Sequence, residues 1–374
     1  MTGRVTPLGY AARVSVGGEV VAESSGALRC DDPEQGASLW FPRADVGAAV
    51  AGGLPVLAAP DDVPALAGYV AFDPATTTVE VLDETVLRWP TWGDAADLVA
   101  VMDVMPADDG SWTSVARAAP DRPVVEGSQM LGQAIVAASR LLPERRVTSA
   151  HMVFVRPADA RRPLRFVLDE VSAGRSFGSF AVRVEDGGRT CAAGTLLLGA
   201  PADDAITHGE PMPDVPGPTA SSPYDMGVTG RDLRVVDGAY TGDPDAPVGP
   251  PELDAWVRFR SVPDDPALHV GLLAQFTGHL SIAAALRAHA GVGESQAHHT
   301  LSTAVNAIAL SVHTDVRVDQ WLLYHHRSTR AVDGMTHSEC RAYQEDGTLV
   351  ASFTVDCMVR PFSGGAVGDR KTSM

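Results

Sequence analysis

The sequence predicts an α+β protein in which one unit, a helix packed on an antiparallel sheet, occurs twice after a smaller β-rich module. Three observations predict this fold class. The 374 residues exceed the ~250 that one hydrophobic core normally organises, so more than one domain is expected. The 36 glycines and 27 prolines are too frequent for long helices throughout and favour short strands and tight turns. The same order of one strand, a helix and then a run of strands also appears in two segments.

Composition and charge narrow the functional class. With 45% hydrophobic and 20% charged residues and a mean hydropathy of +0.02, the chain is expected to be globular. Its net charge of −18 opposes binding to nucleic acid and to anionic membranes. The first ten residues lack a signal-peptide pattern, and no run approaches the ~18 apolar residues of a membrane span. We therefore expect a cytoplasmic protein.

Residues 1–92 are predicted to form the β-rich module. Short alternating runs with glycine turns indicate strands at Arg13–Val16, Glu19–Ala22, Leu39–Pro42 and Tyr69–Phe72. These stretches resemble a family of small β-rich modules of unknown function, and that resemblance implies no chemistry. A scaffolding or partner-docking role is favoured over catalysis, and the partner is unknown.

Residues 97–200 are predicted to form the first repeated unit. An apolar run at Leu98–Val104 is interpreted as a strand. In Ser128–Leu142 apolar residues recur at i, i+3, i+4 and i+7, which is typical of a buried helix. The strands that follow are expected at Ser149–Val155, Leu164–Val171, Ser176–Glu185 and Arg189–Leu198.

Residues 201–250 are rich in proline, glycine and aspartate and are predicted to be a connector, and residues 363–374 a tail. Between them, residues 251–362 repeat the order of the first unit. A strand is expected at Ala255–Arg260, a helix at Ala267–His289, and strands at Ala304–His313, Trp321–Ser328, Gly334–Glu345 and Leu349–Arg360. The repetition predicts duplication of one domain, with both halves sharing one continuous sheet.

The four cysteines lack the spacing of a metal site. In the last predicted hairpin, the Asp346-Gly347 turn pairs Cys340 with Phe353 and not with Cys357. Reduced structural thiols are therefore expected, and neither a metal ion nor a cofactor is.

Several short stretches of the sequence also resemble those of a known protein family. Gly127–Ala134 and Phe154–Pro157 in the first half, and Trp256–Arg258, Trp321–Tyr324 and Val350–Ser352 in the second, resemble the type II acyl-CoA thioesterases. That resemblance implies a double hot-dog fold, in which each half wraps an antiparallel sheet around a central helix. It also implies hydrolysis of an acyl-CoA or acyl-carrier thioester in fatty acyl metabolism, without a cofactor, by a homo-oligomer such as a dimer.

The family's catalytic set is an Asp on the second helix, a Thr opening the next strand and a Gln on the last strand. The resemblance places the Asp at Gly278, the Thr near Ser302 and Thr303, and the Gln at Val355, with Asp356 beside it. Two of the three groups are therefore replaced. Three functions stay open: an acyl thioester hydrolase, an acyl-thioester binder without hydrolysis, and a hydratase or dehydratase.

The residues themselves point to His279 as the base, since a neutral imidazole suits proton abstraction near pH 7. Backbone N–H groups at Gly127 to Gln129, and at Thr277 to His279 if the second helix breaks there, are candidate donors to an oxyanion. The alternatives are a core histidine with a backbone partner and glycines that serve close packing.

Other candidates each have a structural alternative. Glu126 is a second candidate acid or base, or it simply interacts with a helix dipole. Gln133, like Gln129, is a substrate-binding amide or a packed one. The local basic groups bind coenzyme A phosphates or are solvated: Arg145 with Arg146, and Arg156 with Arg161 and Arg162. Ser302 and Thr303 position water or cap a strand, and Asp356 orients His279 only if it faces the helix. The histidines at 298, 299, 325 and 326 are expected to be solvated or on edge strands.

Overall fold

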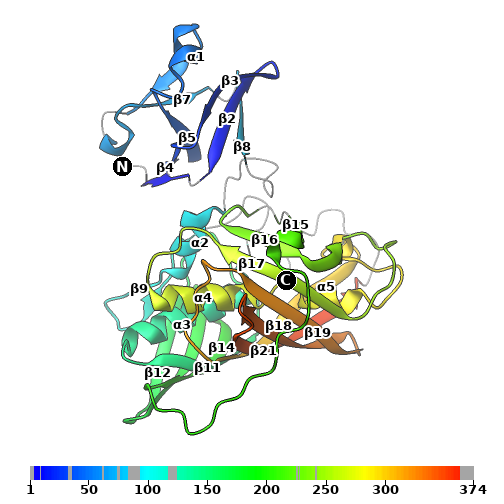
Figure 1. Cartoon of the computed structure of the whole chain (residues 1–374). Coiled ribbons are helices and arrows are strands. Elements are labelled where there is room, and N and C mark those ends of the chain that lie inside the picture. The colour runs from blue at the N-terminus through cyan, green and yellow to red at the C-terminus, as the bar shows by residue number, and fades with distance from the viewer. Residues whose placement is uncertain are drawn as a thin grey trace. The chain divides into compact units, whose positions relative to one another are not determined.

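The computed structural model describes residues 4–8, 10–32, 36–60, 63–73, 76–82, 93–116, 124–224, 226, 228–240 and 242–362 (Figure 1). The chain divides into two compact units. The first comprises Met1–Ala96 with Asp225–Gly230, and the second Asp97–Tyr224 with Arg231–Met374. The predicted tail at 363–374 lies outside the residues that the structure describes.

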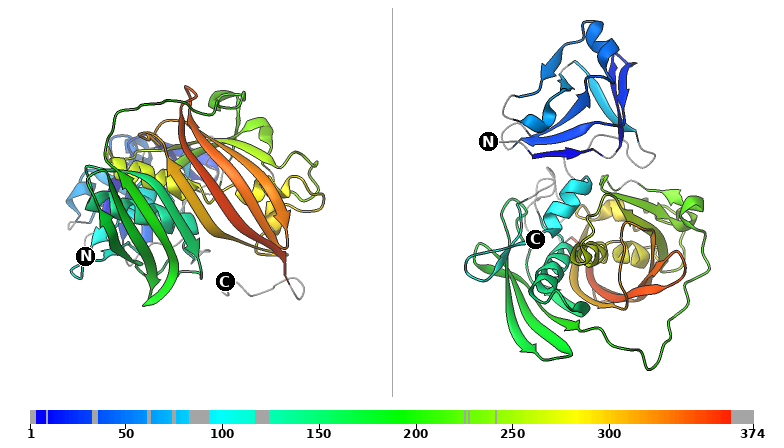
Figure 2. Two further views of the ribbon diagram at one scale, coloured as in Figure 1. Left: turned by 90° about the horizontal axis from the view of Figure 1, so that it is seen from below. Right: turned by 60° about the vertical axis from the view of Figure 1, so that its left-hand side comes forward.

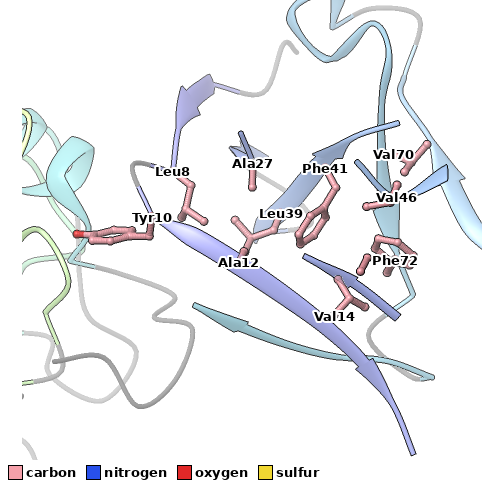
Figure 3. Packing of buried hydrophobic residues seen from close by; sticks show 11 residues of the cluster. Leu8, Tyr10, Ala12, Val14, Ala27, Leu39, Phe41, Val46, Val70 and Phe72 are labelled. Carbon is pink, nitrogen blue, oxygen red and sulfur yellow. The ribbon is translucent and has the colours of Figure 1, made fainter. Parts of the chain in front are cut away.

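The first unit is built of strands, as predicted. Its elements are β1 (Arg4–Pro7), β2 (Ala11–Val16), β3 (Glu19–Ser24), β4 (Leu28–Asp32), β5 (Gly36–Pro42), α1 (Gly47–Ala51), β6 (Val56–Ala58), the 3-10 helix η1 (Pro64–Leu66), β7 (Tyr69–Phe72) and β8 (Thr78–Leu82). They form a five-stranded sheet, β1-β4-β5-β7-β6, and a three-stranded sheet, β3-β2-β8. Apolar side chains from both sheets make the core (Figure 3). In it the rings of Phe41 and Phe72 pack edge to face, with their centres 5.5 Å apart.

The second unit contains one 13-stranded sheet in the order β15-β16-β17-β19-β20-β21-β18-β11-β14-β13-β12-β10-β9. Its first half holds α2 (Ala95–Met102), β9 (Met105–Pro106), β10 (Trp112–Thr113), α3 (Gly127–Leu141), β11 (Arg146–Phe154), β12 (Arg165–Ala173), β13 (Phe177–Asp186) and β14 (Arg189–Gly199). Its second half holds η2 (Pro218–Ala220), β15 (Ser222–Pro223), β16 (Arg231–Val235), η3 (Val236–Gly238), β17 (Glu252–Phe259), α4 (Pro266–Phe276), α5 (Ser281–Leu286), η4 (Glu294–Gln296), β18 (Leu301–Val312), β19 (Leu322–Val332), β20 (Met335–Gln344) and β21 (Leu349–Pro361).

The two halves join where β11 pairs antiparallel with β18, from Ser149 opposite Ser311 to Val153 opposite Ala307. Each half of the sheet curves around its own helices, as Figure 2 shows for the strands of the second half around α4 and α5. The predicted pair of hot-dog units sharing one continuous sheet is therefore confirmed.

Glycines bring α3 and α4 into close contact. A Cβ added to Gly132 would lie 2.4 Å from the carbonyl oxygen of Gly271, and one added to Gly271 would lie 2.6 Å from Val136 Cγ2. No larger side chain fits at either position without moving a helix. The central helices of the two halves therefore pack directly on each other, which places the start of α3 beside the end of α4.

The interpretation of Leu98–Val104 as a strand is wrong, because residues 95–102 form helix α2. Leu98, Val101 and Met102 are buried at i, i+3 and i+4 spacing. A short apolar run suits a buried strand and a buried helix equally well, and packing decides between them. Here the side-chain Nε2 of Gln133 on α3 donates to Val101 O over 2.6 Å, which ties the two helices together.

The helix predicted over Ala267–His289 is interrupted. It forms α4 and α5, with Leu280 between them in the left-handed conformation at φ 65°. By length and hydropathy alone, the stretch Pro266–Leu286 qualifies as a membrane-span candidate, yet 83% of its apolar window is buried inside the protein. Both helices therefore serve the core of the second half.

The segment predicted as a connector contains a strand. β16 pairs with β17 along its whole length, from Arg231 opposite Phe259 to Val235 opposite Ala255. Its charged residues hid the apolar pattern, although Arg231 itself is only 5% exposed. Pro216 lies in the connector before β16, and its carbonyl oxygen accepts a hydrogen bond from the indole Nε1 of Trp256 on β17 over 2.8 Å. This bond holds the connector against the sheet.

The register of the last hairpin is the predicted one. Cys340 lies opposite Phe353, and Cys357 lies opposite Thr336. All four cysteines are buried.

Candidate functional site

The residues of chemical interest meet where the first turn of α3 reaches the break between α4 and α5. Glu126 precedes α3 at its N-cap position, and His279 lies in the break. His279 Nε2 and Glu126 Oε2 are 3.3 Å apart, and the side chains are 12% and 24% exposed. A histidine from one half and a carboxylate from the other therefore form a pair at the junction, and both side chains are partly exposed.

The carboxylate has a second partner. Gln275 Nε2 donates to Glu126 Oε2 over 3.2 Å, and Gln275 Oε1 accepts from Arg231 Nη1 over 3.1 Å. The guanidinium of Arg231 also lies over the Phe276 ring, 5.0 Å from its centre. Burial lowers the pKa of Arg231 to about 10, while the nearby charge of Glu126 acts to raise it. Arg231 stays charged at neutral pH, and Gln275 links it to the carboxylate.

Glycine at two positions allows these elements to approach. A Cβ on Gly278 would lie 2.4 Å from Ser128 Oγ in the first turn of α3, and a Cβ on Gly127 would lie 2.8 Å from the Phe154 ring. The residues predicted to bind substrate at 127 and 278 therefore have a packing role. The hydroxyl of Thr277, a third such candidate, donates to Ala274 O of its own helix over 2.6 Å.

The arrangement suits proton transfer next to a site that stabilises negative charge. A carboxylate 3.3 Å from Nε2 is placed to stabilise the positive charge that a general base acquires when it takes up a proton during reaction. The N-terminus of the 15-residue helix α3 presents N–H groups and the positive end of the helix dipole at the same place. Gln129, in this first turn, is half-buried.

The other predicted site residues lie elsewhere or have structural partners. Asp356 lies on the strand face opposite to buried Val355, and its Oδ1 is 2.6 Å from His337 Nδ1, so it does not face the helices. Thr303 is opposite Val359, and Ser302 is opposite Arg360, near the beginning of β18. Gln133 is fully buried and bonds to α2, as a packed amide would.

The basic residues predicted near coenzyme A phosphates are mostly neutralised. Arg156 is exposed. Arg161 pairs with Asp159 at 2.8 Å, and Arg162 pairs with Asp186 at 3.0 Å. These contacts favour the structural alternative for both.

Sequence reasoning missed Arg231 and Gln275, and it misplaced His326. Arg231 was assigned to the connector, and Gln275 stands on a helix face with no distinguishing pattern. His326 was expected to be solvated or at an edge, but it is fully buried. The alternation of Tyr324, His326 and Ser328 on one strand face was the available signal, since that face carries Leu322 inward as well.

Comparison with known proteins agrees with this architecture. The family described as the acyl-CoA thioesterase N-terminal domain matches residues 117–199, and the acyl-CoA thioesterase C-terminal domain matches residues 206–359. Acyl-coenzyme A thioesterase 8 of Mus musculus is 24% identical over 302 residues, covering 70% of this chain and 88% of the relative. Acyl-CoA thioesterase 2 of Haemophilus influenzae is 24% identical over 254 residues, covering 63% and 87%.

Solved structures share the fold. The tesB protein of Mycobacterium avium subs paratuberculosis superposes with a TM-score of 0.61 at 21% identity, over 72% of this chain and all (100%) of that one. An acyl-CoA thioesterase II from Mycobacterium marinum gives 0.60 at 24% identity, over 71% and 99%. Both family matches begin after the N-terminal β-rich unit, whose resemblance to other modules stays a prediction. The chain belongs to the acyl-CoA thioesterase family, and its double hot-dog body carries both of that family's domains.

Proposed function

We propose that this protein hydrolyses acyl thioesters of coenzyme A, or of an acyl carrier, by direct attack of water. The observation that carries the proposal is the His279–Glu126 pair, 3.3 Å apart at the junction of the two halves. The family relationship supports the substrate class, since the named relatives are acyl-CoA thioesterases. The pair supplies a base where the expected acid position holds Gly278.

In the proposed reaction, His279 takes a proton from water as the water oxygen attacks the thioester carbon. The carbonyl oxygen becomes an oxyanion, stabilised by N–H groups of the first turn of α3. The tetrahedral intermediate collapses with cleavage of the carbon–sulfur bond. The imidazolium returns its proton to the departing sulfur, so the products are a carboxylic acid and a free thiol.

Glu126 is the positioning residue for this base. It holds the imidazole and stabilises the imidazolium that forms, and its own charge is balanced by Arg231 through Gln275. A buried guanidinium requires such a counter-charge, because an uncompensated ion in the interior is strongly unfavourable. The same network therefore stabilises the fold and fixes the carboxylate.

The direct test is release of free thiol from acyl-CoAs of increasing chain length. His279→Ala should lower kcat by ~10²–10⁴-fold, the contribution expected of a general base. His337→Ala is the matched control, because His337 also pairs with a carboxylate, Asp356, but on the outer strand face. A folded His279→Ala protein with a rate within a few fold of the parent would contradict the proposal.

A second function has a specific observation in its favour. The positions of the family's Asp and Gln hold Gly278 and the fully buried Val355, so the chain lacks two groups that resemblance associates with hydrolysis. A non-hydrolytic acyl-thioester binder would bind acyl-CoA without releasing thiol. A hydratase or dehydratase would use the His279–Glu126 pair on the acyl chain, and it would interconvert enoyl- and hydroxyacyl-CoA with no free thiol formed.

We further propose that the protein is a cytoplasmic homodimer. Residues 1–92 would serve as a docking module, followed by a first hot-dog domain at 97–200, a connector at 201–250 and a second hot-dog domain at 251–362. Light scattering of the purified chain tests the dimer. A monomer at micromolar concentration would contradict it.

A further inference from the structure

The core of the second half carries a row of polar side chains where a hot-dog interior is normally apolar. Thr336, Ser338 and Cys340 alternate along β20 and point inward, and they are 5%, 0% and 0% exposed. On the neighbouring strand β19, His326 lies opposite Cys340 and is also 0% exposed. Buried polar groups are normally hydrogen-bonded, so each of these requires a partner.

His326 is held by one ring nitrogen only. Its Nδ1 lies 3.1 Å from Ser281 Oγ and 3.3 Å from Cys340 Sγ. Burial lowers the pKa of His326 to about 3 and raises the pKa of Cys340 to about 12, so the imidazole is neutral and the thiol protonated. In either tautomer of the neutral ring, Nε2 is a polar atom that needs a hydrogen bond.

Three polar atoms of this row lack such a bond. Among the residues that the structure describes, His326 Nε2, Ser338 Oγ and Thr336 Oγ1 are buried and have no hydrogen-bond partner. The side chains of His326 and Ser338 project from adjacent strands onto the interior face, because Ser338 is opposite Ser328 and His326 is two residues before Ser328. A molecule that binds in this interior would therefore have to supply their hydrogen bonds.

The row extends between the proposed catalytic base and a cavity. Ser281, the partner of His326, follows His279 by two residues and begins α5. At the far end of α5, a cavity of about 300 Å³ is lined mostly by apolar residues, among them Ala285 and Leu286 of that helix, together with His289 and with Thr336 of the polar row. The polar row therefore ends in the wall of a mostly apolar cavity.

We propose that the second half binds an acyl chain that bears a hydroxyl or oxo group, with that oxygen hydrogen-bonded by His326 Nε2 and Ser338 Oγ. The apolar cavity at Leu286 receives the rest of the chain. This inference rests on the proposed function for the location of the thioester and names its substrate class. A plain hydrocarbon chain leaves both polar atoms without a partner, which disfavours it relative to an oxygenated chain of equal length.

Binding of matched ligands tests this, using the full-length His279→Ala protein so that turnover does not interfere. Decanoyl-CoA is compared by calorimetry with hydroxydecanoyl-CoAs that carry the hydroxyl near the thioester or midway along the chain. We expect one hydroxylated ligand to bind at least ~10-fold more tightly than decanoyl-CoA, since discrimination by unpaired buried groups is large. Equal affinities would overturn the proposal and assign the polar atoms to ordered water.

A pair of serine variants locates the effect. Ser338→Ala should reduce the preference to within about twofold, the loss expected on removal of one of the two partners. Ser328→Ala is the matched control, because Ser328 lies opposite Ser338 at similar burial but its hydroxyl already donates to His337 O. A preference that survives in Ser338→Ala would overturn the assignment. Absence of thiol release by the parent protein, with the binding preference intact, would refute only the proposed hydrolysis.

Discussion

Replacing Glu126 by Gln removes one charge and almost no volume. The new side chain retains an oxygen that accepts from Gln275, so the network of hydrogen bonds to Arg231 is preserved. What is lost is the attraction between the carboxylate and the imidazolium of His279, 3.3 Å away. Two unit charges at ~4 Å interact by roughly 4 kcal/mol at an effective dielectric constant of ~20, and partial exposure of both side chains reduces this.

We expect half or less of that attraction to be realised in the transition state, or ~1.4–2 kcal/mol, which corresponds to a ~10–30-fold lower kcat. KM should change little, because the imidazolium forms only during the reaction. The assay is thiol release from a saturating acyl-CoA, with thermal unfolding measured beside it to exclude a folding defect.

The double variant sharpens the test. If Glu126 acts through His279, Glu126→Gln should have almost no effect on a protein that already carries His279→Ala, since residues acting as a unit are not additive. Multiplicative losses in the double variant would refute the reasoning and give Glu126 an independent role. An unchanged kcat in the Glu126→Gln variant would refute the proposed cooperation of Glu126 with His279.

Three further outcomes are expected. Gly278→Ala should destabilise the protein by ~1–3 kcal/mol, because its Cβ would lie 2.4 Å from Ser128 Oγ; an unchanged denaturation midpoint would argue against the close approach of α3. Burial lowers the pKa of His326 to about 3, so the unfolded chain binds a proton that the folded chain refuses, and stability should fall as pH drops from ~6.5 toward 3. His326→Gln should flatten that part of the urea stability profile, and an identical slope would assign it to other groups. Deletion of residues 1–92 should leave a soluble body that still releases thiol; a folded but inactive truncation would place the module in catalysis.

The sequence by itself determined the parts of the fold that depend on local patterns. Period-2 and period-3.6 alternation placed α3 and the strands of both halves, and the repeated order implied their shared sheet. The Asp346-Gly347 turn set the hairpin register that pairs Cys340 with Phe353. Each of these features depends on residues that are close together in sequence, and the sequence alone is therefore enough to predict it.

Tertiary structure decided what depends on distant contacts. The run at 98–104 is compatible with helix or strand, and packing on α3 made its larger part a helix. The strand identity of β16 became visible only through its pairing with β17, and with it the buried charge of Arg231. Glu126 and Gln275 are 149 residues apart in sequence, and they meet because glycines let α3 and α4 touch. No local pattern encodes such a meeting, since it is the packing of two duplicated halves that brings the acid of one to the histidine of the other.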